Sequence, residues 1–419
     1  MTVCMLLLFL LGFIGMGLDF GKLFVVKSEL QTAMDSCALA AAQELDLQPT
    51  AITRATSAGQ TAGNLNPVNF QSANWSGQGQ LVNADITFKA PDYSVTTDPT
   101  VAQYVECRHV QPGVRLWLLQ ALGAFSGDTT LYPPTQNVAA AAVATRAHGQ
   151  TTCPLPVTLK PRECSPGVPC TGPNYGMIPG EWVTVLTSQS AIPGGYIGWA
   201  NLDGSNSASE TVAEMDGSCG VAVNDVLGTP GTQTVIAERW NYRFGIYKNR
   251  LPDFSVDPSS MRPDLSGYAY TAVNWPRSST ECAGIPGTLP CKAYDGATPA
   301  GAHPTADDFV AKQASFAACA PDLDWRTCES ITGLSLNSFH YLSDGSAGTN
   351  NRRVVTVPVT DSGNRVIDFM CMFMLQPLSI PMTDVQLEYI GNASLPTSPC
   401  SFSGMPGGAA GPLVPALVR

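Results

Sequence analysis

The five residues from Asp203 to Ser207 carry the sequence pattern most suggestive of chemistry. They read Asp-Gly-Ser-Asn-Ser, and a D-x-S-x-S pattern can place a carboxylate and two hydroxyl oxygens around a divalent cation, because hard cations prefer oxygen ligands. A simpler structure fits the same residues. Ser207 and Glu210 form an S-x-x-E capping box, which would begin a helix over residues 208–215 without a metal. The sequence favours this helix cap.

The rest of the sequence lacks a catalytic motif. It contains neither an H-E-x-x-H nor a G-x-S-x-G pattern, so metalloprotease and hydrolase chemistry have no recognisable starting point. Paired acids such as Asp307 with Asp308, or Asp322 with Asp324, lie in proline-containing loops, where acids usually serve as solvated turn residues. We therefore expect a non-enzymatic protein without cofactor or metal. An envelope hydrolase is a less favoured alternative, because no nucleophile and base can be named.

The cysteines indicate an oxidising compartment. Of the 13 cysteines, Cys4 lies in an apolar N-terminal run, and the other twelve form an even set that is typical of disulfide bonding. Their spacing does not match zinc ligands, since no C-x-x-C is present. Three close pairs could each close a local loop, and the other pairings stay open. The pairs are Cys164 with Cys170, Cys282 with Cys291, and Cys319 with Cys328.

Composition excludes one class of partner. The net charge is −11, with 22 basic against 33 acidic residues and no run of Lys or Arg, so the basic patch that nucleic-acid binding requires is missing. The 39 glycines and 33 prolines are typical of turn-rich and strand-rich extracellular proteins. We therefore expect no nucleic-acid partner and a fold of the α+β class.

The chain begins with a segment suited to a membrane. Residues 1–18 contain no charge and no proline, and 18 helical residues measure about 27 Å, close to the hydrocarbon thickness of a bilayer. The sequence therefore predicts a retained membrane-spanning helix with lipid as its partner. Lys22 and Lys27 follow this span while no basic residue precedes it, which agrees with the positive-inside rule if a basic leader ahead of Met1 has been cleaved.

The helical pattern continues beyond the apolar segment. Small or apolar residues recur at steps of three and four, with a period of eleven residues that keeps them on one face of a nearly straight helix. Three glycines in the preceding span would let another helix approach closely. The predicted helix-packing residues are Gly12, Gly15, Gly17, Leu23, Val26, Leu30, Met34, Cys37, Ala41 and Leu45.

Three regions follow from these patterns. Residues 1–48 form the transmembrane and stalk helix. Residues 64–150 form a small α+β domain whose sheet covers the helix stripe, and residues 151–419 form a β-rich, cysteine-containing distal domain. In the small domain we expect strands at 81–89, 103–110 and 138–147 and a helix at 114–122. In the distal domain we expect strands at 182–186, 220–226, 234–237, 353–358, 366–375, 385–390 and 413–418, with an irregular excursion from 248 to 333.

Two N-terminal segments carry a family resemblance. LGFIGMGLDFGKL, from Leu11 to Leu23, and LQTAMDSCALAAA, from Leu30 to Ala42, resemble the TadE/TadG-like proteins of the tight-adherence (Flp) pilus system. That family opens with an apolar helix, an Asp and Gly step and a Leu-Gln-x-Ala-x-Asp run. Weaker echoes are the expected strand 138–147 leading into Cys153-Pro154-Leu155-Pro156, Arg352 to Val355, and Leu417-Val418.

The resemblance implies a structural protein of the cell envelope. It would be a pilin-like subunit or a pilus-assembly accessory, located in the inner membrane with a periplasmic or extracellular body, or in a surface filament. Its N-terminal helix would anchor in the membrane or pack in a filament core with other pilin-like subunits or copies of itself. Its disulfide-bonded head would be displayed outside, and no catalytic residues come with the family. The alternative is a surface adhesin that uses the divalent-cation pattern at Asp203.

Overall fold

The computed structural model describes residues 2–69, 80–116, 134–150, 153–187, 192–229, 236–257, 259–264, 325–342, 352–400 and 405–418, with the backbone alone for residues 2–12. The chain divides into two compact units. The first comprises Met1–Ala147 and Val414–Arg419, and the second comprises His148–Leu413. The protein is mixed α+β, with a long N-terminal helix and several β-sheets.

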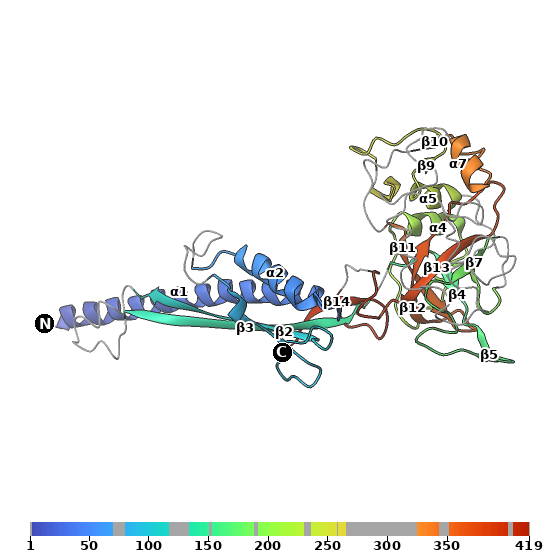
Figure 1. The fold of residues 1–419 in the computed structure, drawn as a ribbon. Helices are drawn as coiled ribbons and strands as arrows, with labels where there is room; N and C mark the ends of the chain where they lie inside the picture. Colours follow the sequence, from blue (N-terminus) through green and yellow to red (C-terminus); the bar gives the residue numbers. More distant parts are fainter. Residues whose placement is uncertain are drawn as a thin grey trace. The chain divides into compact units, whose positions relative to one another are not determined.

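Two helices pack together in the first unit (Figure 1). α1 runs from Thr2 to Gln43, and α2 runs from Ala51 to Asn64. The buried side of α2 consists of Ala51, Ala55, Gly59 and Gly63, which recur every four residues and so lie along one face. Because these residues are small, the backbones of the two helices come close together. α2 lies in a segment for which the sequence predicted no element, since its apolar face lacks large side chains.

A four-stranded sheet faces α1. Its strands are β1 (Ile86–Lys89), β2 (Tyr104–Arg115), β3 (Thr135–His148) and β14 (Leu413–Val418), in the order β1-β2-β3-β14. β2 and β3 pair antiparallel from Tyr104 opposite Thr145 to Arg115 opposite Thr135, with a bulge between Gln111 and Val114. The C-terminal strand thus belongs to the first unit, whereas the expected boundaries from the sequence place it in the distal region.

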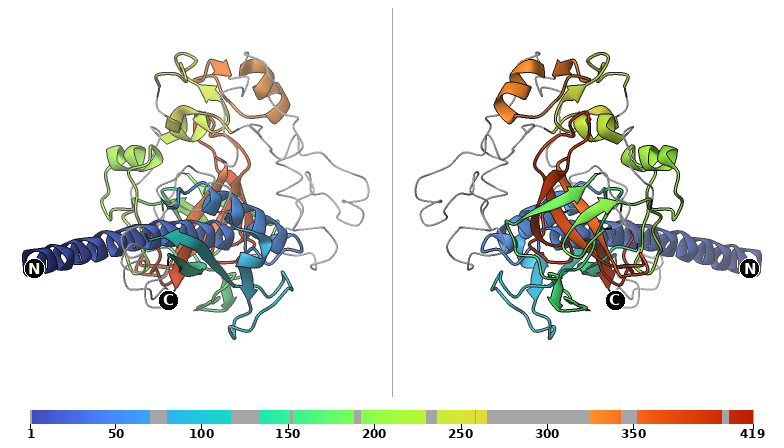
Figure 2. Two further views of the ribbon diagram at one scale, coloured as in Figure 1. Left: turned by 90° about the vertical axis from the view of Figure 1, so that its left-hand side faces the viewer. Right: turned by 90° about the vertical axis from the view of Figure 1, so that its right-hand side faces the viewer.

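The second unit is built around a closed six-stranded barrel (Figure 2). Barrel strands and surrounding elements share one apolar core cluster, which includes Trp240, Phe339 and Tyr389. The strand order is β11-β12-β13-β7-β8-β4. The strands are β4 (Val157–Leu159), β7 (Trp182–Leu186), β8 (Ile197–Trp199), β11 (Val354–Thr360), β12 (Val366–Met374) and β13 (Val385–Asn392).

Short elements surround the barrel. Two two-stranded sheets pair β5 (Glu163–Ser165) with β6 (Val168–Pro169) and β9 (Ile246–Tyr247) with β10 (Tyr341–Leu342). The helices are α4 (Ala208–Met215), α5 (Ile236–Tyr242) and α7 (Trp325–Thr332). Short 3-10 turns form at Asn83–Asp85 and Ser259–Met261. The second unit therefore displays loops and helices on a closed β framework.

Three element predictions in the small domain and the distal region are wrong. A helix was expected at 114–122, but residues 114 and 115 are the last residues of β2. The strand continues that far because Pro112 and Gly113, which has φ +67°, form a bulge and do not end it. Residues 117–122 lie outside the described ones. Residues 220–226 form turns with isolated bridges instead of a strand, and Asn224 has φ +81° there. A strand was expected at 234–237, but Ile236 and Ala237 begin helix α5, whose Trp240 is fully buried. Residues 234 and 235 lie outside the described ones.

Smaller differences concern boundaries. The strand expected at 81–89 starts at Ile86, because residues 83–85 form a 3-10 turn. The excursion from 248 to 333 contains helix α7 in its described part, and residues 265–324 lie outside the described ones. Over the part of the chain that the structure describes, no helix combines the length and apolarity needed to cross a membrane. The predicted span over residues 1–18 is therefore not confirmed, and the side chains of residues 1–12 fall outside the description.

Candidate functional site

One face of α1 is buried by the first unit's own residues. Of the predicted helix-packing residues, Val26, Leu30, Met34, Cys37 and Ala41 are fully buried. Leu45 is buried just beyond the helix end, and Leu23 is half-buried. They pack against inward-facing residues of the sheet. The sheet residues are Ile86, Phe88, Val105, Cys107, Val138, Ala140, Ala142 and Ala144. The alanines of β3 leave room for the helix, so the C-terminal half of α1 is covered within the chain.

Polar side chains of α1 also bind the sheet. Gln31 Nε2 donates to the carbonyl oxygen of Ala141 at 3.0 Å, Lys27 Nζ donates to that of Ala139, and Lys22 Nζ donates to that of Arg115 at 3.1 Å. These contacts satisfy strand carbonyl groups that would otherwise need another partner. α1 is thus fixed to β2 and β3 by hydrogen bonds as well as by apolar packing.

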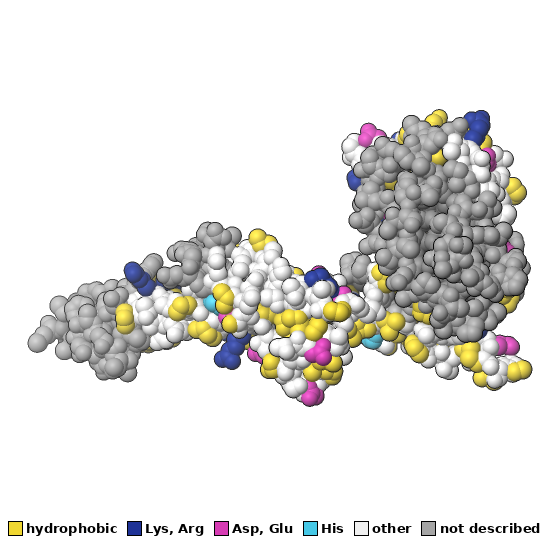
Figure 3. Space-filling view, viewed as in Figure 1, with side chains coloured by type: hydrophobic (Ala, Val, Ile, Leu, Met, Phe, Trp, Pro, Cys, Tyr) yellow, Lys and Arg dark blue, Asp and Glu magenta, His cyan; other side chains and the backbone are white. Residues whose placement is uncertain are grey.

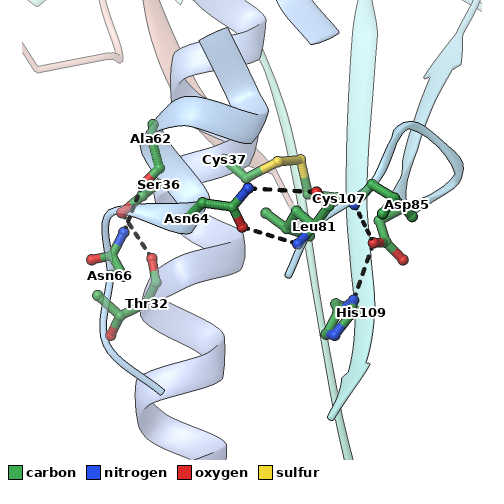
Figure 4. Close-up of a disulfide and its surroundings, with 11 residues drawn as sticks. Thr32, Ser36, Cys37, Ala62, Asn64, Asn66, Leu81, Asp85, Cys107 and His109 are labelled. Carbon is green, nitrogen blue, oxygen red and sulfur yellow. Dashed lines mark hydrogen bonds and ion pairs between the residues drawn. A yellow bond between two sulfur atoms is a disulfide. The ribbon is translucent and has the colours of Figure 1, made fainter. Parts of the chain in front are cut away.

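A disulfide joins α1 to the sheet (Figure 4). Cys37 bonds to Cys107 of β2 across 70 residues of sequence, and both side chains are fully buried. Beside it, the Asn64 side chain closes the end of α2: Leu81 N donates to Asn64 Oδ1 at 2.9 Å. The sequence left this pairing open, because cysteines 70 residues apart show no local spacing signal.

The N-terminal part of α1 presents a different, exposed face. Phe13, Phe20 and Phe24 are 65 %, 51 % and 77 % exposed, and we call these three residues the aromatic stripe. Their spacing of seven and eleven residues places them within roughly 40° of one another on the helix, about 100° from the buried helix-packing residues. Ile14 and Leu18 add exposed apolar surface nearby. Exposed apolar patches of this kind mark interaction sites.

The glycines of the predicted packing set differ from one another. Gly15 is buried, whereas Gly17 is exposed, and a Cβ added there would meet no atom within 4 Å. Gly12 lies in the part described by backbone alone.

In the space-filling view, hydrophobic side chains are visible along the first unit (Figure 3). The aromatic stripe was not predicted from the sequence, because the helical pattern was followed through the small and apolar residues of the predicted packing face; the spacing of the phenylalanines was the available signal.

The candidate cation segment is occupied by hydrogen bonds within the chain. Asp203 Oδ1 accepts from the backbone N–H of Ser205 at 2.9 Å, and Ser205 Oγ accepts from Asn201 Nδ2 at 3.0 Å. α4 begins at Ala208, but Ser207 makes no side-chain cap bond; its hydroxyl contacts Ser209 Oγ at 2.7 Å. The predicted helix over 208–215 is confirmed with Ser207 at its N-cap position, but the predicted side-chain bond of the capping box is absent, because the Ser207 hydroxyl contacts Ser209 instead.

Glu214 fixes this segment from inside α4. Its Oε1 accepts from the backbone N–H groups of Leu202 and Asp203 at 2.8 and 3.3 Å, and the residue is 5 % exposed. Burial raises the pKa of Glu214 to about 7, although the two backbone N–H bonds lower it; the nearby carboxylates of Asp203 and Glu210 raise it slightly further. The turn is thus held by a carboxyl group that is partly protonated near neutral pH. Among the described residues, no group of three or more His, Cys, Asp or Glu side chains could hold a metal.

Four disulfides are placed among the described residues. Cys164 bonds to Cys170 within the β5–β6 hairpin, and three further bonds join distant cysteines. These are Cys37 with Cys107, Cys153 with Cys219, and Cys371 with Cys400. Cys328 is also disulfide-bonded, while Cys282, Cys291 and Cys319 lie outside the described residues. The disulfides indicate that the protein is extracytoplasmic.

Comparison with known proteins identifies the N-terminal segment. Residues 1–44 match the Tad family model, described as putative Flp pilus-assembly TadE/G-like, which confirms the resemblance seen in the sequence. The match covers α1 and the residues at its two ends. No curated protein and no solved structure matches the chain. The match shows what the N-terminal helix is similar to, and the disulfides agree with a location in the cell envelope.

Proposed function

We propose, from the TadE/G-like character of residues 1–44, that this protein is a non-enzymatic structural component of an Flp-type pilus or of its assembly apparatus. The N-terminal part of α1 is the surface through which it joins that structure. The second unit is then the body carried outside the inner membrane, in keeping with its disulfides.

The observation that carries the proposal is the change of environment along α1. From Val26 to Leu45 the apolar face is covered by the chain's own sheet and by α2. Before Val26, most large apolar side chains are exposed, namely Phe13, Ile14, Met16, Leu18, Phe20, Phe24 and Val25. Burying an aromatic side chain contributes about 1.5–3 kcal/mol. The aromatic stripe therefore favours association with an apolar partner, and the covered half fixes the direction in which the stripe projects.

Two kinds of partner fit this surface. In the first, the N-terminal part of α1 as far as Phe24 lies in or at the membrane, and the aromatic stripe contacts lipid or a neighbouring helix. In the second, the helices of several copies, or of this chain and other pilin-like subunits, pack together in a filament, with Gly17 allowing close approach. Both versions require the same apolar face. They differ in whether detergent releases single molecules or leaves fibres intact.

Cell fractionation tests the proposal with a matched pair of double variants. Phe20→Asp with Phe24→Asp places charge on the stripe without touching the residues packed on the sheet. We expect the wild-type chain in the membrane or sheared-fibre fraction and at least about tenfold less of the variant there, because a carboxylate in an apolar contact costs several kcal/mol.

The control replaces two exposed polar residues of the same helix, Ser28→Asp with Thr32→Asp. It adds the same charge outside the stripe and should fractionate like the wild type. Circular dichroism of both variants checks that the fold is retained. A wild-type chain found only in the soluble fraction, or equal loss from the fractions in both variants, would reject the proposed role of the stripe.

A further inference from the structure

The second unit contains a groove that the proposed pilus role does not use. It has a volume of about 890 Å³, within the range of sites that hold small organic ligands. Its wall on one side is the β5–β6 hairpin with Glu163 and Pro169, and its opposite wall is the turn between β11 and β12, with Asp361, Ser362 and Asn364. All of its lining residues belong to the second unit.

The groove walls are held rigidly. The Cys164–Cys170 disulfide closes the hairpin, and the β11–β12 turn is fixed because Asp361 Oδ1 accepts from the backbone N–H groups of Gly363 and Arg365 at 2.8 and 2.9 Å. Gly194 lies where a Cβ would come within 2.7 Å of the Pro161 carbonyl oxygen, so β4 and the segment before β8 approach closely. A preformed site binds without the cost of ordering its loops.

Lys160 is bound to the β11–β12 turn. Its Nζ donates to the carbonyl oxygen of Asp361 and to Asn364 Oδ1, the latter at 2.8 Å. Burial lowers the pKa of Lys160, and the Asp361 carboxylate opposes that change. Because Asn364 Oδ1 accepts from Lys160, the Nδ2 group of Asn364 is the part of the amide that remains to donate to a ligand.

The other lining groups are chemically mixed. The hydroxyl-bearing residues Thr171, Thr229 and Ser362 are exposed in the groove, and each hydroxyl can both donate and accept. Ile192 and Ile367 supply apolar surface between them. A ligand that fits must therefore combine hydroxyl groups with apolar C–H faces, which is the chemistry of a neutral sugar ring.

Charge and topology argue against two other ligand classes. The charged lining residues are Lys160, Glu163 and Asp361, a formal sum of −1, so a polyanion would not be attracted. An extended peptide usually adds to an open strand edge. The barrel strands beside the groove have no open edge, and the strands β5 and β6 are only three and two residues long, which leaves room for few ladder hydrogen bonds. Aromatic ladders that bind polyproline are also missing, since Tyr175 is the one aromatic residue among the described lining residues.

We propose that this groove is a binding site for a neutral oligosaccharide. Lys160 and Asn364 position its polar wall, the three hydroxyl-bearing residues bind sugar hydroxyls, and the isoleucines contact the ring faces. The proposal is independent of the pilus role, because it concerns residues of the second unit alone.

Titration calorimetry of the full chain tests the proposal. The probes are cellotetraose, maltotetraose and the tetramer of N-acetylglucosamine, with a polygalacturonate fragment and a proline oligomer as probes of the other classes. We expect saturable binding of at least one neutral tetrasaccharide. Thr229→Trp, which fills the groove, should weaken that binding at least about tenfold, the equivalent of about 1.4 kcal/mol.

Thr397→Trp is the matched control, because Thr397 is an exposed threonine of the same unit outside the groove lining. Asn364→Gly removes the amide donors at a residue with φ +58°, a conformation that glycine accepts, and it should also weaken binding. The inference is overturned if no neutral tetrasaccharide binds, if only the acidic fragment or the proline oligomer binds, or if Thr229→Trp binds as well as Thr397→Trp.

Discussion

Removing the Cys37–Cys107 disulfide is expected to destabilise the first unit by about 4 kcal/mol, the loop-closure estimate for a bond that spans 70 residues. The double variant Cys37→Ala with Cys107→Ala should keep the second unit intact, because that unit has its own core and disulfides. The bond links α1 directly to β2, so its loss frees the helix from the sheet that covers it.

Hydrogen exchange of the full chain measures this effect locally. Amides of α1 between Val26 and Gln43, and of β2, should exchange about 1,000-fold faster in the variant, which corresponds to about 4 kcal/mol. The control, Cys164→Ser with Cys170→Ser, opens a bond that spans 6 residues and should leave the first unit unchanged. Unchanged protection of α1 in the Cys37 and Cys107 variant would show that packing alone holds the helix.

Enlarging Gly59 is expected to displace α2 from α1. A Cβ at this position would come within 3.2 Å of Ala41 Cβ, the Cys37 carbonyl oxygen and Cys37 Sγ, none of which is the end of a flexible side chain. Gly59→Leu should therefore destabilise the packing of α2 by about 2–3 kcal/mol, even though leucine favours helix more than glycine does by nearly 1 kcal/mol.

Exchange of the amides from Ala51 to Asn64 reports on this packing. Ser57→Leu makes the matched change at an exposed position of the same helix, where the better helix propensity of leucine should slow exchange slightly. Faster exchange in Gly59→Leu together with slower or equal exchange in Ser57→Leu is the expected pattern. If Gly59→Leu were as protected as the wild type, close packing through small residues would not describe this interface.

The mixed α+β class and the long N-terminal helix were predictable because their signals are local. The helix has an apolar run followed by an eleven-residue repeat, and α1 spans Thr2–Gln43. β12 and β13 were likewise legible as runs rich in apolar and β-branched residues, at 366–374 and 385–392. Each of these features depends on neighbouring residues, which sequence periodicity describes directly.

Other features depend on partners that are distant in sequence. α2 packs through alanine and glycine, which carry no apolar periodicity. β14 joins β3 from more than 260 residues away, and closure of the barrel requires β4 to pair with both β8 and β11. The hydroxyl of Ser207 had two partners available, and only the folded chain shows that Ser209 is the closer one. The groove near Lys160 combines five separate segments and has no sequence motif.

Site-specific photo-crosslinking in cells tests the central claim, that the N-terminal part of α1 is the association surface and the remainder is covered within the chain. Benzoylphenylalanine replaces Phe24, which is 77 % exposed, or Met34, which is fully buried against the sheet. The account predicts that position 24 gives crosslinks to a second pilus-fraction protein or to lipid, whereas position 34 gives intramolecular products alone. Intramolecular products alone at position 24 would contradict it.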